Sequence, residues 1–188
     1  YEDVTLLKED KEFTFQTNLE KDVLDYPLSK GRKIYVSNEG DDSNDGLSEN
    51  KPIKTINKVN SLSLQAGDNI LFKKGETFTG ALSFTSLSGD DNNPITFASY
   101  GDGSKPIITN KFSNVFSVEK GSNIVVRDLK FIGENKKRDE TTTCYNIISF
   151  SYSFVKENKY KNIYICDNEV EGNGTDSMLM GITVTSTE

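Results

Sequence analysis

The chain has 188 residues and is acidic, with 29 aspartates and glutamates against 22 lysines and arginines and a formal net charge of −7. This charge disfavours nucleic acid and anionic membrane surfaces as partners. No apolar run is long enough to insert into a membrane as a span, and the 34% hydrophobic content predicts one domain with an ordinary core. The absence of histidine excludes Ser-His-Asp and Cys-His catalysis and histidine-ligated zinc.

Residues 1–32 are highly charged and mixed in pattern. The segment Asn18–Tyr26 carries apolar residues at helical spacing before Pro27, and the charges around it are typical of a solvated face. We interpret residues 1–32 as an N-terminal extension or as a linker from a preceding module.

Residues 33–75 contain two predicted strands separated by an acidic loop and a helix. The run 34–36 consists of strand formers, and the Asp, Asn, Ser and Gly residues at 40–46 predict a loop. The second strand is the apolar run 69–72, which ends in a turn at 73–75.

The helix is predicted between these two strands. Thr55 is a suitable N-cap, and Pro52 lies just upstream. Ile56, Val59 and Leu62 recur at helical spacing and form one apolar stripe. Because this stripe needs a partner, we expect an amphipathic helix that seals the first layer of the structure behind it.

The acidic loop contains one candidate metal site. Asp41, Asp42 and Asp45 place oxygen side chains before Gly46, which partly resembles the start of a calcium loop, but the twelfth position is Pro52 where that pattern requires Glu. Two interpretations follow: calcium as a cofactor held by the three aspartates, or a hydrogen-bonded turn. We favour the turn, because Asp-Asn-Gly clusters are common turn chemistry.

Beyond residue 75, short strands alternate with polar turns and no further helix is predicted. Phe78, Leu82 and Phe84 are expected core positions, and strands are predicted at 94–100 and 106–109. This rhythm excludes a doubly wound sheet and leaves a sandwich or a solenoid.

Four sequence words in this part resemble the opening of right-handed parallel β-helix proteins: IYVSNEGDDSNDG, PIKTINKV, AGDNILFKKGETFTG and NNPITFASYGDGSKPII. They are similar in particular to the bacterial secreted group that includes the family-nine pectate lyases and other polysaccharide-degrading enzymes. The resemblance implies an all-β fold, a right-handed parallel β-helix of three-strand coils. It also implies that residues 33–75 form an N-terminal cap with a capping helix, and that residues 76–188 form the first coils.

An internal repeat supports the solenoid. Residues 123–133 (NIVVRDLKFIG) align with residues 162–172 (NIYICDNEVEG) at an offset of 39 residues, as expected of units that bury apolar faces against their neighbours. This offset exceeds the coil of about 20 to 25 residues that the resemblance implies, so we expect outward loops at 134–144 and 155–160. The positions expected to point inward are Ile124, Val126, Leu129, Phe131, Ile163, Ile165 and Val170.

Two stacked pairs follow from this alignment. Asn123 over Asn162 predicts a side-chain amide ladder, which in-register strands favour. Asp128 over Asp167 is either a metal or catalytic pair or a bend between two strands. We favour the bend, because Asp and Asn are used there for their turn geometry.

Cys144 and Cys166 are the only cysteines and lie 22 residues apart. Neighbouring coils are close enough for a disulfide, yet the alignment puts the two residues on different faces of the coil. We therefore favour two buried free thiols over a bridge.

Residues 181–186 look like the first strand of another coil, and no terminal cap follows them. We therefore expect an amino-terminal fragment of a longer protein, truncated at its C-terminus. The start at Tyr1 rather than at Met is consistent with a trimmed chain.

Catalytic candidates are few. Polysaccharide lyases of this fold, as the resemblance implies, use calcium-binding carboxylates and a basic side chain that removes a proton from the sugar. The nearest approach is Arg127, Asp128 and Lys130, with Asp167 one coil further on. Lys130 aligns with an acidic residue and Arg127 with a cysteine, so no basic row continues. We expect the complete active site in later coils.

Aromatic residues supply the candidates for sugar binding. Tyr152, Tyr160 and Tyr164 either stack on sugar faces or fill the coil interior. Lysines at 156, 159 and 161 beside them would suit an acidic glycan.

Two functions remain open at this point. The first is a secreted or cell-surface bacterial carbohydrate-active protein, a polysaccharide lyase or a glycoside hydrolase, whose partner is a polysaccharide or glycan. The alternative is a non-catalytic adhesin or glycan-binding protein that uses the same solenoid as a flat binding face. Fold does not distinguish them. In either case we expect a monomer.

Overall fold

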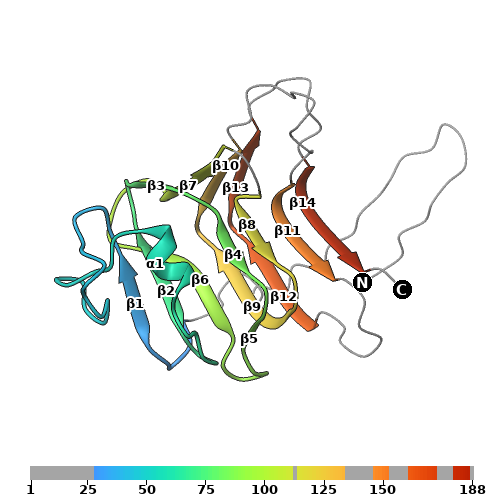
Figure 1. The fold of residues 1–188 in the computed structure, drawn as a ribbon, viewed down its shortest axis with the longest axis horizontal. Helices are drawn as coiled ribbons and strands as arrows, with labels where there is room; N and C mark the ends of the chain where they lie inside the picture. Colours follow the sequence, from blue (N-terminus) through green and yellow to red (C-terminus); the bar gives the residue numbers. More distant parts are fainter. Residues whose placement is uncertain (1–27, 112–113, 134–145, 153–160, 173–179, 187–188) are drawn as a thin grey trace, which may run out of the picture.

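The structure is a computed structural model that describes residues 28–111, 114–133, 146–152, 161–172 and 180–186. In these residues the chain forms one short helix and fourteen strands. The strands make up three sheets, and every pairing between them is parallel (Figure 1).

The three sheets contain one strand from each circuit of the chain. The first sheet consists of β1 (Lys33–Val36), β2 (Asn69–Lys73), β6 (Ile95–Tyr100), β9 (Gly121–Arg127) and β12 (Lys161–Cys166), with the short β5 (Leu87–Ser88) paired to β9. The second sheet consists of β3 (Thr77–Thr79), β7 (Ile107–Asn110), β10 (Lys130–Gly133) and β13 (Glu169–Gly172). The third sheet consists of β4 (Leu82–Phe84), β8 (Phe116–Val118), β11 (Asn146–Tyr152) and β14 (Met180–Ser186).

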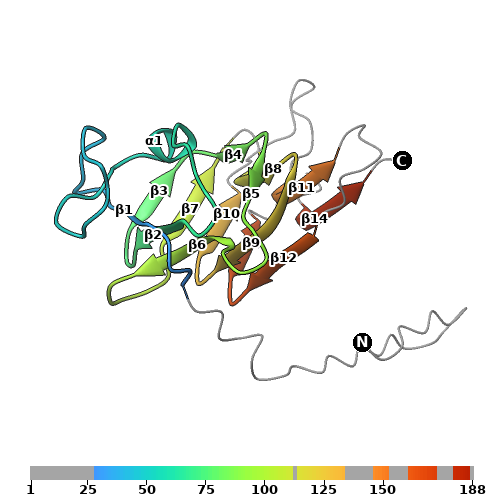
Figure 2. The same ribbon diagram turned by 90° about the horizontal axis from the view of Figure 1, so that it is seen from below.

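Each circuit of three strands is called a rung below. The four rungs are β2-β3-β4, β6-β7-β8, β9-β10-β11 and β12-β13-β14, and β1 precedes the first of them. Figure 2 shows the rungs following one another along the molecule, with β2, β6, β9 and β12 side by side. This arrangement is a parallel β-helix of three-strand coils. It confirms the predicted stack of parallel three-strand coils and rules out the sandwich.

The core lies between the three sheets and is built from one inward-facing set of apolar side chains. Phe116 is fully buried, and its ring centre lies 5.1 Å from that of Phe97 and 5.8 Å from that of Phe150. Stacked rungs bring such rings into contact at each step, in the tilted and edge-to-face geometries that aromatic pairs favour. The predicted core positions Phe78, Leu82 and Phe84 are all buried.

The internal repeat corresponds to the pairing of β9 with β12. Ile124 pairs with Ile163 and Val126 with Ile165, which is the predicted offset. Ile124, Val126, Leu129 and Phe131 are fully buried, and Ile163 and Ile165 pack partly buried against the same core. Val170 differs from the expectation. It is 37% exposed, although its register partner in β10 is fully buried.

The two stacked pairs also take the predicted form. Nδ2 of Asn162 donates to Oδ1 of Asn123 at 2.7 Å, which forms the amide ladder. Asp128 and Asp167 have φ angles of 54° and 52°, and the two asparagines have similar positive values. Asn and Asp tolerate this left-handed region better than most residues, because their short polar side chains bond locally. The carboxylate pair therefore occupies bends, as favoured above.

The helix α1 (Ile56–Asn60) is shorter than the apolar stripe that predicted it. Thr55 is its N-cap, and Oγ1 of Thr55 accepts a hydrogen bond from the Lys58 amide at 3.0 Å. Ile56 and Val59 are buried, whereas Leu62 lies beyond the helix end and packs partly buried against the core. With five residues, α1 is too short to cross a membrane, and it is the one helix among the described residues.

Side chains from the segment before β2 bond to the open edge of the first rung. The amide of Asn60 donates to the Ala81 carbonyl at 2.8 Å and accepts from the Ser83 amide at 3.1 Å. The amide of Asn38 donates to the Thr77 carbonyl at 3.1 Å. These contacts satisfy backbone groups that an edge strand would otherwise leave unpaired.

The outer edge of β1 is covered by the loop after it. The Tyr35 amide donates to the Gly46 carbonyl at 2.8 Å, and the Ile53 amide donates to the Tyr35 carbonyl at 3.0 Å. The chain therefore folds back over its own first strand, and β1 is paired on both sides.

Candidate functional site

The turn between β9 and β10 holds Asp128 in an ion pair. Nζ of Lys74, from the turn after β2, lies 3.1 Å from Oδ2 of Asp128. The hydroxyl of Ser99 donates a hydrogen bond to the same oxygen. The carboxylate is thus held by a cation and a hydroxyl from the two preceding rungs.

Asp167, in the equivalent turn one rung later, uses a different cation. Nζ of Lys105 lies 3.0 Å from its carboxylate and donates to its backbone carbonyl at 2.7 Å. The next residue, Asn168, accepts from the Leu129 amide at 3.1 Å and donates to the Val126 carbonyl at 2.7 Å. The turn residues therefore tie neighbouring rungs together. Sequence reasoning missed Lys74 and Lys105, because they precede their partners by whole rungs.

Lys130 is also engaged in ion pairs. Its ammonium lies 2.8 Å from Oε2 of Glu171 and 3.8 Å from Glu169. The hydrogen bond with Glu171 raises the pKa of Lys130, because it stabilises the protonated form. A raised pKa makes this lysine a poor general base at neutral pH.

Arg127 stands in register with Cys166 on the first sheet, as the alignment predicted. Its Nε is buried and has no hydrogen-bond partner among the described residues. Cys166 is a half-buried free thiol, and burial raises its pKa. Cys144 lies outside the described residues. Asp128, Lys130 and Asp167 therefore each pair with a different partner. Together with Arg127 they do not form one shared site in the described residues.

The three candidate calcium ligands each hold a turn. Oδ1 of Asp41 accepts from the Ser43 amide at 2.7 Å, and Oδ1 of Asp45 accepts from the Leu47 amide at 3.0 Å. Asp42 accepts from the Thr55 hydroxyl at 2.7 Å and from two backbone amides beside it. In the part of the chain that the structure describes, no group of three His, Cys, Asp or Glu side chains is arranged to hold a metal.

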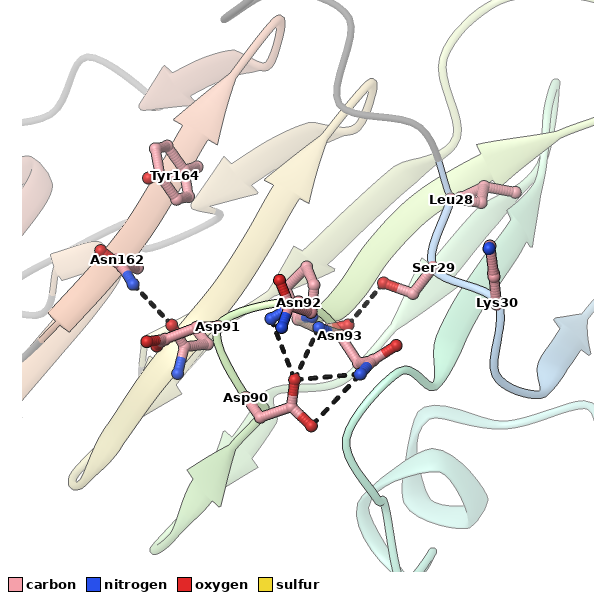
Figure 3. Close-up of a pocket in the computed structure, with 11 residues that line it drawn as sticks. Leu28, Ser29, Lys30, Asp90, Asp91, Asn92, Asn93, Asn162 and Tyr164 are labelled. Atoms are coloured by element: carbon pink, nitrogen blue, oxygen red, sulfur yellow. Dashed lines mark hydrogen bonds between the residues drawn. The ribbon is translucent and has the colours of Figure 1, made fainter.

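A cavity of about 480 Å³ lies on the outer side of the first sheet (Figure 3). It has three walls: residues 28–30, the turn 90–94 between β5 and β6, and the starts of the paired strands β9 and β12. The lining residues are Leu28, Ser29, Lys30, Asp90, Asp91, Asn92, Asn93, Pro94, Asn123, Asn162 and Tyr164.

A buried asparagine fixes the first wall. Asn69, at the start of β2, accepts from the Ser29 amide at 2.9 Å and donates to the Ser29 carbonyl at 3.0 Å. The Ser29 hydroxyl donates to the Pro94 carbonyl at 2.9 Å, which joins this wall to the next. Asn69 is fully buried, so the segment 28–30 is held by the sheet itself.

The second wall is a tight turn closed by Asp90. Its Oδ1 accepts from the backbone amides of Asn92 and Asn93 at 3.0 and 2.8 Å. The Asn92 amide is the largest cause of a lowered pKa at Asp90, so this carboxylate stays ionised. The side chain of Asn92 does not bond to Asp90 and is exposed to solvent.

The third wall contains one of the predicted sugar-binding residues. Tyr164 is half-buried on β12 and lies above Asn162 in Figure 3. Tyr152 belongs to β11 in the third sheet, so it does not share this face, and Tyr160 lies outside the described residues. Lys30 and Asn92 were missed by the sequence reasoning, because only the fold brings them beside β12.

Comparison with known proteins finds carbohydrate-active enzymes. The chain is 32% identical over 140 residues to a lacto-N-biosidase of Bifidobacterium longum, which covers 71% of this chain and 8% of the relative. Its structure superposes on the GH136 lacto-N-biosidase of Eubacterium ramulus with a TM-score of 0.59 and 22% identity, over 81% of this chain and 30% of that one. The structure of a rhamnogalacturonan lyase superposes with a TM-score of 0.49 and 21% identity, over 75% of this chain and 38% of the lyase chain.

No protein-family model matches the chain. The chain spans 8% of the length of the curated relative and 30% of the solved lacto-N-biosidase. The chain thus has partial similarity to carbohydrate-active enzymes, and it shares its parallel β-helix fold with the E. ramulus enzyme.

Proposed function

We propose that this chain is part of a secreted or cell-surface glycoside hydrolase built on a right-handed parallel β-helix. The observation that carries this proposal is the 32% identity over 140 residues to a lacto-N-biosidase. That similarity covers 71% of the chain, and the relative's name specifies a glycan-cleaving activity.

The ion pairs in and beside the turns before β10 and β13 do not support a lyase base within the described rungs. A lyase base must be neutral to accept the proton next to the sugar carboxylate. Lys130 is the central basic candidate, and its pairing with Glu171 stabilises the protonated form. The stacked carboxylates Asp128 and Asp167 are also each neutralised by a lysine.

Within such an enzyme, we assign residues 33–75 the role of an N-terminal cap. Ile56 and Val59 of α1 are buried in the core, and α1 packs against β4 of the first rung. The side-chain bonds of Asn38 and Asn60 to the edges of β3 and β4 support this role. A covered first edge prevents pairing with another chain.

The test is an assay of the whole protein that carries this chain. It is incubated with an aryl lacto-N-bioside, with pectate and with alginate, each with and without calcium. We expect release of the aryl group and of a saturated sugar, independent of calcium. Unsaturated products from pectate or alginate would overturn the hydrolase assignment in favour of a lyase.

A second candidate is a non-catalytic glycan-binding protein. It is favoured by the corner carboxylates, because Asp128 and Asp167 are bonded to lysines rather than arranged as an acid and a base. Retention of the whole protein on an immobilised glycan, with no product from any of the substrates above, would establish this alternative.

A further inference from the structure

We propose that the cavity on the outer side of the first sheet binds an uncharged saccharide. The choice of a saccharide as ligand rests on the proposed function, whereas the location and the preference for an uncharged sugar rest on the cavity itself. The site is separate from the turns before β10 and β13, where the ion-paired carboxylates of Asp128 and Asp167 lie.

The cavity has the size and rigidity of a ligand site. Its volume of about 480 Å³ lies within the range of about 300 to 1,000 Å³ that is typical of small-molecule sites. Two of its walls are fixed by hydrogen bonds: Asn69 holds the segment at Ser29, and Asp90 closes the turn. A ligand therefore meets a preformed surface, which lowers the entropic cost of binding.

The polar groups at the cavity suit hydroxyl groups. Nδ2 of Asn162 is used by the amide ladder, which fixes the orientation of that side chain and leaves its Oδ1 without a donor from the described residues. The side chains of Asn92 and Lys30 likewise have no hydrogen-bond or ion-pair partner within the described ranges. Side-chain amides both donate and accept hydrogen bonds. Sugar hydroxyl groups do the same, so the two kinds of group can pair.

The charges at the cavity select against acidic sugars. Among the described lining residues, Asp90 and Asp91 contribute two carboxylates and Lys30 contributes one ammonium. A uronic acid would bring a further negative charge into this surrounding, and like charges at close range are unfavourable. The lysines at 156 and 159, which suggested an acidic glycan in the sequence, lie outside the described residues.

Tyr164 supplies the apolar face that a pyranose ring needs. In the first sheet, Tyr164 pairs with Val125, which in turn pairs with Thr96. Val125 and Thr96 are each only 1% exposed, whereas Tyr164 keeps part of its side chain accessible at the cavity. A tyrosine ring combines an apolar body with a polar tip, and it packs well against the C–H face of a sugar.

The test uses the full chain and two defined disaccharides. Lacto-N-biose, which is uncharged, and digalacturonate, which is acidic, are titrated by calorimetry and by NMR of the side-chain amides. We expect lacto-N-biose to bind, with shifts at the amides of Asn92 and Asn162, and digalacturonate to bind at least about tenfold more weakly. The NMR readout needs no variant, so it does not depend on whether a mutant folds.

Three variants locate the binding. Tyr164→Ala is expected to weaken lacto-N-biose binding about tenfold and Asn92→Ala about threefold, while Tyr164→Phe retains most of it. Asn57→Ala is the matched control, because Asn57 is exposed on α1 and does not line the cavity. Its affinity should equal that of the native chain.

The outcomes separate this inference from the proposed function. If the variants bind like the native chain, or if digalacturonate binds more tightly, the cavity is not a site for uncharged sugars, whatever the whole protein hydrolyses. If binding is lost in the Tyr164 and Asn92 variants but the whole protein cleaves nothing, the cavity site stands and the hydrolase assignment fails.

Discussion

The first and the last described rungs differ in how far their apolar side chains are covered. At the first end, Ile56 of α1 is buried, and the side chains of Asn38 and Asn60 bond to the backbone edges of β3 and β4. In the last described rung, Val170 and Ile182 are 37% and 51% exposed, although their register partners one rung earlier are fully buried. In a stacked fold, whether a side chain is buried therefore depends on the presence of a neighbouring rung as well as on the residue type.

The largest expected effect contrasts the same substitution at the two ends. Ile56→Ala should lower the free energy of unfolding by about 2 to 5 kcal/mol, because it removes buried methyl groups and leaves a cavity. Ile182→Ala should lower it by less than about 1 kcal/mol, because that side chain is half exposed. Urea denaturation of both variants measures the difference. Equal losses would mean that the two ends are equally covered in solution.

The next effect concerns the loop that covers β1. Asp42→Asn should lower the free energy of unfolding by about 1 to 2 kcal/mol at pH 7, because the carboxylate accepts from the Thr55 hydroxyl and from the amides of Lys54 and Thr55. Asp102→Asn, at an exposed turn residue, is the control and should change stability by less than about 0.5 kcal/mol.

The pH dependence of the Asp42 effect has a defined sign. Burial alone would raise the pKa of Asp42, but the hydrogen bonds from Thr55 and Lys54 outweigh it and the net pKa is lowered. The stabilisation is then fully present above the ordinary value of 3.8 and is lost as the pH falls through the lower folded-state pKa. The free energies of unfolding of the native protein and of Asp42→Asn should therefore converge once the pH is below the folded-state pKa of Asp42. A constant gap down to pH 2 would contradict this account.

A smaller effect tests the bonds at the edge of β4. Asn60→Ala should cost about 1 to 2 kcal/mol, since the Ala81 carbonyl and the Ser83 amide both lose a partner. Asn57→Ala, on the same helix but exposed, should cost less than about 0.5 kcal/mol. Thermal unfolding of the pair gives the comparison, and hydrogen exchange at Ser83 reports the edge directly. Unchanged exchange would show that water replaces the side chain without cost.

The smallest expected effect lies in the amide ladder near the last rung. Asn162 has a φ of 55°, which glycine adopts freely and alanine does not. Asn162→Ala should therefore be less stable than Asn162→Gly by about 1 kcal/mol, although both lose the bond to Asn123. Denaturant titration measures the gap. The reverse order would mean that the positive φ is not maintained in solution.

The parts of the fold that depend on local pattern could be predicted from the sequence. The repeat gave the register of β9 and β12, and the stacked Asn and Asp residues adopt the left-handed geometry that their chemistry favours. Thr55 was recognisable as an N-cap because capping depends on neighbours within one turn. The length of α1 was not predictable, because tertiary packing rather than helical spacing positions Leu62.

The candidate site was only partly predictable. Tyr164 was one of three tyrosines expected either to stack on a sugar or to fill the interior. Its neighbours Lys30 and Asn92 come from segments more than one rung away. Their proximity depends on the bonds of Ser29 to Asn69 and Pro94, which have no local sequence signal. Lys74 and Lys105 were missed for the same reason, since ion pairs across rungs follow the stacking rather than the order of the chain.

The unequal length of successive circuits has an evolutionary consequence. In the first sheet, Asn69 pairs with Thr96, Ile95 with Ile124, and Ile124 with Ile163, so the distance along the chain grows from 27 to 29 to 39 residues while the strands stay in register. The extra residues fall between the paired strands along the chain, and the register of the strands is unaltered. Evolution can therefore lengthen one connection between strands by insertion, and so place new side chains on the surface, while the stacked core stays the same.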